Sequence, residues 1–108
     1  MKRNLMAMPL ILAIALLIYV GAGAAEAADV QNGAALSHRW CAPCHVVASD
    51  QRQPTGEAAP FAEIAKRPKF DAEHVAYFLL APHPRMPDMA LSRSEAADLA
   101  VYISSLRK

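Results

Sequence analysis

Hydrophobic residues are concentrated at the start of the chain and follow helical intervals in the remainder. Residues 5–25 carry no charge, and residues 10–20 form an apolar run. From residue 29 onward charged residues recur every few positions, without a convincing period-two alternation of apolar and polar residues. The pattern therefore predicts an apolar N-terminal segment followed by a domain without strands.

Three stretches of this domain have the periodicity of helices: residues 29–40, residues 71–80, and a stretch that begins after Ser92. Ser92-Arg93-Ser94-Glu95 matches a capping box, in which the serine hydroxyl accepts from a free backbone N–H and Glu95 reaches back to the cap. Asp71 is a candidate cap for the second helix. A short helical turn is expected over residues 61–65, and prolines mark the loops between these elements. An apolar stripe follows the capping box, formed by Ala96, Leu99, Ile103 and Leu106, with Tyr102 beside it. The expected fold class is all-α, with three to four short helices.

Residues 1–27 have the layout of a secretory signal peptide. Lys2 and Arg3 give a basic start, residues 10–20 an apolar core and residues 21–28 a run of small residues. We predict cleavage after Ala27, which leaves residues 28–108 as the domain. An uncleaved anchor is the alternative, because about 20 apolar residues cross a bilayer. Both place the domain outside the cytoplasm, and we expect it in the periplasm.

The charge balance of the domain argues against nucleic acid as a partner. Removal of residues 1–27 takes Lys2 and Arg3 from 11 basic residues, leaving 9, and Glu26 from 10 acidic residues, leaving 9. Phosphate binding needs a clustered basic excess, which a neutral domain lacks. A domain this small also buries a modest core, so a bound cofactor, a metal or a disulfide is expected to stabilise it.

The motif Cys41-Ala42-Pro43-Cys44-His45 predicts that this cofactor is haem. Two thiols at this spacing can add to the two vinyl groups of one haem, and the histidine that follows then lies next to the iron. His45 is therefore the predicted proximal iron ligand. A disulfide between Cys41 and Cys44 would close a very short loop and stabilise little. A thioredoxin-like pair needs a preceding strand, and a zinc site needs two more ligands nearby.

The order of export signal, glycine-containing helix, CxxCH, proline-rich middle, Met-Pro and capped last helix resembles the small class I cytochromes c, from about residue 29 to residue 107. The resemblance implies the cytochrome c fold around one covalently bound haem c. It also implies that the first and last helices cross with a small residue against an aromatic one, and Gly33 and Tyr102 match these places.

The distal iron ligand is expected in the loop before the last helix. The family's ligand methionine is commonly followed by proline, and Met86 in Pro84-Arg85-Met86-Pro87 fits this place. Flanking prolines stiffen a loop, which helps to hold a weak iron–sulfur bond. Met89 is the second choice, with a gap-filling core role as its alternative. His83 shares the loop and is the histidine that is hardest to dismiss as a ligand.

The surroundings of His45 are also implied by the resemblance. Its other ring N–H should donate to a loop carbonyl, for which Pro60 is favoured and Pro54 is second. The expected pocket walls are apolar or aromatic side chains: Trp40, Phe61, Tyr77, Phe78 and Leu79.

An iron with six ligands has no open position for a substrate, so the expected function is one-electron transfer and not enzymatic catalysis. We expect weak, transient docking to redox proteins or membrane complexes, as a monomer, with Lys66-Arg67-Pro68-Lys69 as a candidate docking patch. One alternative is an open haem site that binds gases or turns over peroxide, with His83 as its acid/base. Another is a membrane-tethered subunit of a larger redox complex.

Overall fold

The computed structural model describes residues 26–51, 58–81 and 84–108. Four α-helices form the regular structure of these ranges: α2 (Val30–Trp40), α3 (Phe61–Lys66), α4 (Ala72–Leu80) and α5 (Arg93–Ser105). The all-α prediction and the four predicted helical stretches are confirmed. The predicted signal segment lies almost wholly outside the described residues, as do Pro54 and His83. No helix in the described ranges has the length and apolarity needed to cross a membrane.

Side-chain caps define where the longer helices begin. Asp29 precedes α2, and its Oδ1 accepts from the N–H of Gln31 at 2.8 Å and of Asn32 at 3.1 Å. Asp71 caps α4 in the same way. The capping box of α5 is complete: Glu95 N–H donates to Ser92 Oγ at 3.1 Å, and Ser92 N–H donates to Glu95 Oε2 at 2.8 Å. These caps satisfy N–H groups that have no partner inside a helix.

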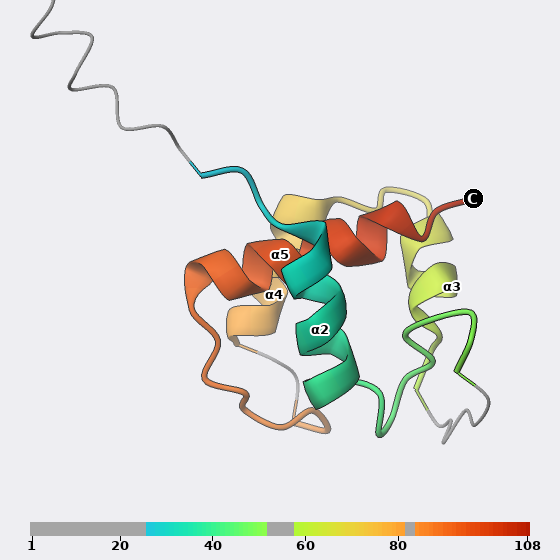
Figure 1. Ribbon diagram of the computed structural model, residues 1–108, viewed down its shortest axis with the longest axis horizontal. Helices are drawn as coiled ribbons and strands as arrows, with labels where there is room; N and C mark the ends of the chain where they lie inside the picture. The colour runs from blue at the N-terminus through green and yellow to red at the C-terminus, as the bar shows by residue number, and fades with distance from the viewer. Residues whose placement is uncertain (1–25, 52–57, 82–83) are drawn as a thin grey trace, which may run out of the picture.

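The last helix is the centre of the arrangement (Figure 1). Helices α2, α3 and α4 each pack on α5, and within the described ranges no two of the three pack on one another. Helix α3 lies toward the C-terminal end of α5, and α2 crosses α5 nearer its start (Figure 1). Every interhelical contact of the described domain thus depends on α5.

Gly33 allows the close crossing of α2 and α5. A Cβ atom on Gly33 would lie 2.6 Å from the carbonyl carbon of Asp98 and 2.8 Å from the Cβ of Tyr102, distances at which something must move. The predicted meeting of Gly33 and Tyr102 is confirmed. Asp98 also fixes the crossing through its buried carboxylate: Oδ1 accepts from Asp29 N–H and Oδ2 accepts from the Asn32 side chain, both at 2.7 Å.

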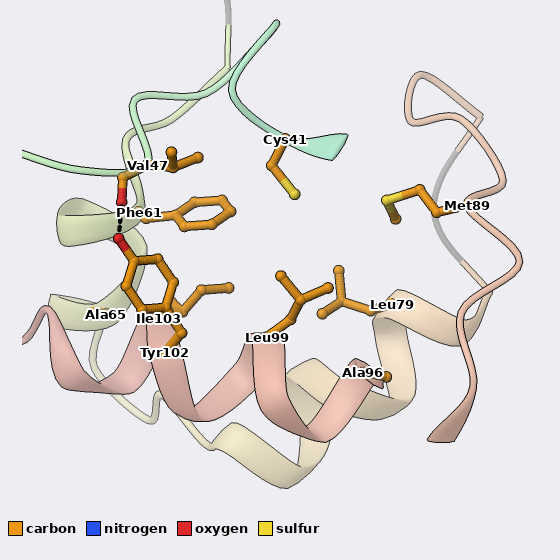
Figure 2. Close-up of a cluster of buried hydrophobic side chains, with 10 residues drawn as sticks. All are labelled: Cys41, Val47, Phe61, Ala65, Leu79, Met89, Ala96, Leu99, Tyr102 and Ile103. Atoms are coloured by element: carbon orange, nitrogen blue, oxygen red, sulfur yellow. Dashed lines mark hydrogen bonds between the residues drawn. The ribbon is translucent and has the colours of Figure 1, made fainter. Parts of the chain in front are cut away.

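Ten buried apolar side chains form a cluster, which is drawn in Figure 2. Phe61, Leu79, Met89, Leu99 and Cys41 come from different segments, and their side chains point toward a common region. Among the described residues, Leu99 and Val47 are the largest apolar side chains that are completely buried. The core is as thin as the domain length predicts, which fits a fold completed by a bulky apolar group.

Candidate functional site

The CxxCH motif forms a tight turn directly after α2. Cys41 is the C-cap of α2, and its carbonyl accepts from the N–H of Cys44 at 3.1 Å and of His45 at 2.8 Å. This turn brings both cysteines and the histidine close together in a short segment held by the end of the helix. The three residues of the predicted haem attachment site therefore share one rigid support.

The two cysteines of this turn are free thiols in different environments. Cys41 is 5% exposed and points into the core, whereas Cys44 is exposed (Figure 2 draws Cys41). Burial, with a smaller contribution from Cys44, raises the pKa of Cys41 to about 11. Cys41 is thus a protonated, apolar thiol next to the core, a suitable place for a thioether to a buried ring.

His45 is oriented by a backbone carbonyl. Its Nδ1 lies 2.7 Å from the carbonyl oxygen of Ala59, and its ring lies 5.2 Å from the ring of Phe61 at an angle of 49°. A carbonyl only accepts, so Nδ1 carries a proton, and in the neutral imidazole Nε2 therefore keeps its lone pair. This is the tautomer that an iron ligand requires.

The carbonyl that holds His45 belongs to Ala59 and not to Pro60, which corrects the prediction for this hydrogen bond. Pro60 is the N-cap of α3, and its carbonyl already accepts from the N–H of Glu63 and of Ile64, each at 3.0 Å. A carbonyl aligned with a helix axis cannot also face His45. The preceding carbonyl, Ala59, is the one that remains for the imidazole.

The segment after His45 is held from three directions. Phe61 N–H donates to Val46 O at 3.0 Å, and the Tyr102 hydroxyl donates to Val47 O at 2.6 Å. The side chain of Gln51 bonds this segment a third time, accepting from Val47 N–H at 2.8 Å and donating to His45 O at 3.0 Å. Sequence reasoning missed Gln51 and the hydroxyl of Tyr102, since neither stands in a recognisable motif.

The two candidate methionines both contact the core but differ in burial. Met86 is half-buried and packs against the cluster, in the loop between α4 and α5. Met89 is 7% exposed, and its side chain points toward the region between Cys41 and Leu99 (Figure 2). The structure thus brings both thioethers to the core that Cys41 borders, and the choice of Met86 stays a prediction.

The expected pocket walls divide into two groups. Phe61 and Leu79 are buried members of the core, at 4% and 7% exposure. Trp40 and Phe78 are more than a third exposed, and Tyr77 is 75% exposed. Arg39 lies over the Trp40 ring, with its guanidinium carbon 5.0 Å from the centroid. A role for these three exposed aromatic residues against a cofactor stays a prediction.

The residues present fit a haem of the c type. The donor set consists of a paired thiol arrangement, one imidazole with Nε2 available, and thioethers at the core. The apolar thiol side of the turn adjoins buried carbon side chains, as an apolar macrocycle requires.

Comparison with known proteins gives the same answer. No family model and no solved structure matches the chain. Cytochrome c-552 of Bradyrhizobium diazoefficiens, a curated protein, is 48% identical over 107 residues, which cover 99% of each chain. Identity at this level over almost the whole length, together with the CxxCH turn and the all-α fold, shows that the chain belongs to the small c-type cytochromes.

Proposed function

We propose that this chain is a one-electron carrier outside the cytoplasm, with a single haem attached to Cys41 and Cys44 and ligated by His45 and Met86. The observation that carries the proposal is the hydrogen bond of 2.7 Å between His45 Nδ1 and Ala59 O. It fixes the imidazole with Nε2 available, directly after the two thiols. A bound haem supplies an iron that gains and loses one electron.

The side chains around the motif exclude water from one face of this site. Phe61 packs beside His45, and Leu79 and Leu99 lie below the thiol of Cys41 in the same cluster (Figure 2). Fixed apolar side chains reorganise little when a neighbouring charge changes, which favours fast electron exchange. With haem bound, a methionine thioether as the second protein ligand would leave no position on the iron for a substrate and would raise the reduction potential.

Met86 is proposed as that thioether because it lies next to Pro87 in a loop whose other methionine is already a core residue. Met89 is buried, and the neighbouring Ala90 adopts a left-handed conformation with φ 49°. Asp88 Oδ1 accepts from Ala90 N–H at 2.9 Å, which fixes this bend. Met89 thereby anchors the loop, and Met86 is free to serve as a ligand.

The visible absorption spectrum tests this proposal, with Met86→Ala and Met89→Ala as matched variants. The oxidised wild-type protein should show the weak far-red band of sulfur-to-iron charge transfer. Met86→Ala should lose the band, whereas Met89→Ala should keep it and unfold more easily. Mass spectrometry under denaturing conditions should find one haem bound to the chain, since thioethers survive unfolding.

Three results would contradict the proposal. A high-spin wild-type protein that readily binds carbon monoxide would have an open site, and the carrier function would be wrong. Loss of the band in Met89→Ala but not in Met86→Ala would reverse the assignment of the ligand. A mature chain that still begins near residue 1 would indicate a membrane-tethered form, in place of cleavage after Ala27.

We also propose that partners dock weakly at a basic cluster, defined by the exposed residues Lys66, Arg67, Lys69 and Arg107. Arg107 Nη2 donates to Arg67 O at 3.3 Å, so the C-terminus extends the predicted patch. Replacement of Lys66, Arg67 and Lys69 by Gln should flatten the salt dependence of oxidation by membranes of the source organism. Arg39→Gln and Arg93→Gln, exposed elsewhere, should leave it unchanged; an unchanged dependence in the triple variant would remove the docking role.

A further inference from the structure

We infer that Gln51 is a positioning residue for the iron ligand His45. The inference rests on the proposed function, because it assigns to Gln51 the task of holding the segment that carries the ligand. Gln51 lies six residues after His45 and is half-buried. No sequence motif includes it, and its importance is apparent only from its contacts.

The amide side chain of Gln51 forms hydrogen bonds with three residues of the turn and of the segment that follows it. Gln51 Oε1 accepts from Val47 N–H at 2.8 Å, and Nε2 donates to His45 O at 3.0 Å and to Ala42 O at 3.3 Å. The bonds reach both sides of the histidine in the chain. A primary amide is the smallest side chain that can accept on one side and donate twice on the other.

The other contacts of the segment explain why Gln51 matters for the imidazole. Val46 O and Val47 O are bound by Phe61 and Tyr102, which fix the chain after the histidine. Of the backbone groups on His45 itself, the N–H donates to Cys41 O, and the carbonyl accepts from Gln51. Gln51 is therefore the side chain that fixes the peptide plane of the ligand, and with it the direction from which the ring reaches Ala59 O.

Loss of the amide should loosen the ligand selectively. Gln51→Met keeps the length of the side chain but has no N–H donor and no strong acceptor. The freed carbonyls can turn toward water, so His45 should move and its bond to Ala59 should open more often. Gln51→Glu keeps an acceptor for Val47 N–H and loses both donated hydrogen bonds. It should therefore hold Val47 as the wild-type side chain does, but loosen His45.

The matched control is Asn32→Leu, which also removes one amide side chain. Asn32 donates to Asp98 at the crossing of α2 and α5, far from His45 in the chain. The variant should lower stability without touching the turn. It separates a general loss of stability from a specific loss of ligand orientation.

The test measures hydrogen exchange of His45 Nδ1–H and Val47 N–H by NMR in the haem-loaded protein, with the reduction potential alongside. Gln51→Met should raise the exchange rates of both protons at least tenfold and shift the reduction potential. Gln51→Glu should leave the exchange rate of Val47 N–H low and raise that of His45 Nδ1–H. Asn32→Leu should change neither the His45 exchange nor the potential.

Unchanged His45 exchange and potential in both Gln51 variants would overturn the inference, while a wild-type spectrum with histidine ligation would leave the proposed function standing. If Gln51→Met does not load haem, the His45 exchange rate and the reduction potential of Gln51→Glu are the test. A wild-type protein without a histidine-ligated haem would instead overturn the proposed function itself.

Discussion

Gly33 and Asp98 meet at the crossing of α2 and α5 with no room for a methyl group between them. A Cβ atom on Gly33 would lie 2.6 Å from the carbonyl carbon of Asp98. The Asp98 carboxylate at the same place accepts from Asp29 N–H and from the Asn32 side chain. Steric fit and polar pairing thus act on the same pair of helices, and each can be tested separately.

Gly33→Ala should destabilise the protein although alanine favours a helix by about 1 kcal/mol. The methyl group would overlap Asp98 and Tyr102, and overpacking costs about 1–3 kcal/mol. Urea unfolding should therefore show a lower midpoint. Ala35→Gly, on an exposed position of α2, is the control and should cost about 1 kcal/mol. A more stable Gly33→Ala variant would show that the helices do not cross this closely.

Asp98→Asn should weaken the crossing through its hydrogen bonds. The amide keeps one acceptor oxygen, so either Asp29 N–H or the Asn32 side chain loses its partner. An unsatisfied buried group costs about 1–3 kcal/mol. Chemical denaturation should report a loss in this range, whereas Asp88→Asn, in an exposed loop, should change little. Equal losses in the two variants would contradict the role given to Asp98.

Tyr102→Phe should destabilise the protein most below pH 10. The variant leaves Val47 O without its donor, a loss of about 1–3 kcal/mol. Burial raises the pKa of Tyr102 in the folded state, so the unfolded chain, with a pKa of about 10, releases its proton first as the pH rises. Above that pH the free energy of unfolding of the wild-type protein therefore falls, because the hydrogen bond of the protonated Tyr102 hydroxyl is offset by ionisation in the unfolded chain. The phenylalanine variant has no hydroxyl, so this part of its stability does not change with pH.

Unfolding curves of both proteins between about pH 7 and pH 11 test this expectation. The stability difference should narrow at the alkaline end, because only the wild-type chain carries a hydroxyl that titrates there. A difference that stays constant would show that Tyr102 titrates at its ordinary pKa in the folded state, and one that grows with pH would show that folding lowers its pKa.

The capping box of α5 should weaken in acid. Hydrogen bonds from Ser92 lower the pKa of Glu95, so the folded state favours the ionised carboxylate. Its contribution is present above the ordinary pKa of glutamate and is lost as the pH falls through the lowered folded value. Glu95→Gln should accordingly flatten part of the acid branch of the stability curve. Ser92→Ala should cost about 1 kcal/mol near neutral pH.

Met89 should behave as a packing residue. Met89→Leu conserves volume and should cost less than about 1.5 kcal/mol. Met89→Ala leaves a cavity, and losses of about 2–5 kcal/mol are typical for such a change. Thermal unfolding followed by circular dichroism gives both values. A Met89→Leu variant that loses the far-red band would instead identify Met89 as the ligand.

The helices and their caps were predictable because their signals are local. Asp71 and Ser92 were predicted as caps, and the structure confirms both. Asp29, predicted as the start of the first helical stretch, is the N-cap of α2. CxxCH was equally readable, since the chemistry of two thioethers fixes its spacing. The crossing of Gly33 and Tyr102 followed from family resemblance, because nothing local in the chain joins residues so far apart.

The acceptor for His45 and the role of Gln51 depend on three-dimensional placement. Ala59 and Pro60 are adjacent, and both have a carbonyl that could accept from His45. Because α3 begins at Phe61, the Pro60 carbonyl accepts from N–H groups of the helix, and the Ala59 carbonyl accepts from His45. Asp98 reads as an ordinary polar position on a helix, and only the crossing shows that its carboxylate is buried. Such pairings join segments by geometry and leave no periodic trace in the sequence.

The dependence of all helix packing on α5 has a consequence for how the protein is made. α5 follows α2, α3 and α4 in the chain, and these three helices have no helical neighbour of their own among the described residues until it is present. A chain that ends before Arg93 would lack every one of these interhelical contacts, and with them the core around Cys41. We therefore expect the Cys41 thiol to stay accessible until the thirteen residues of α5 have packed on the other helices.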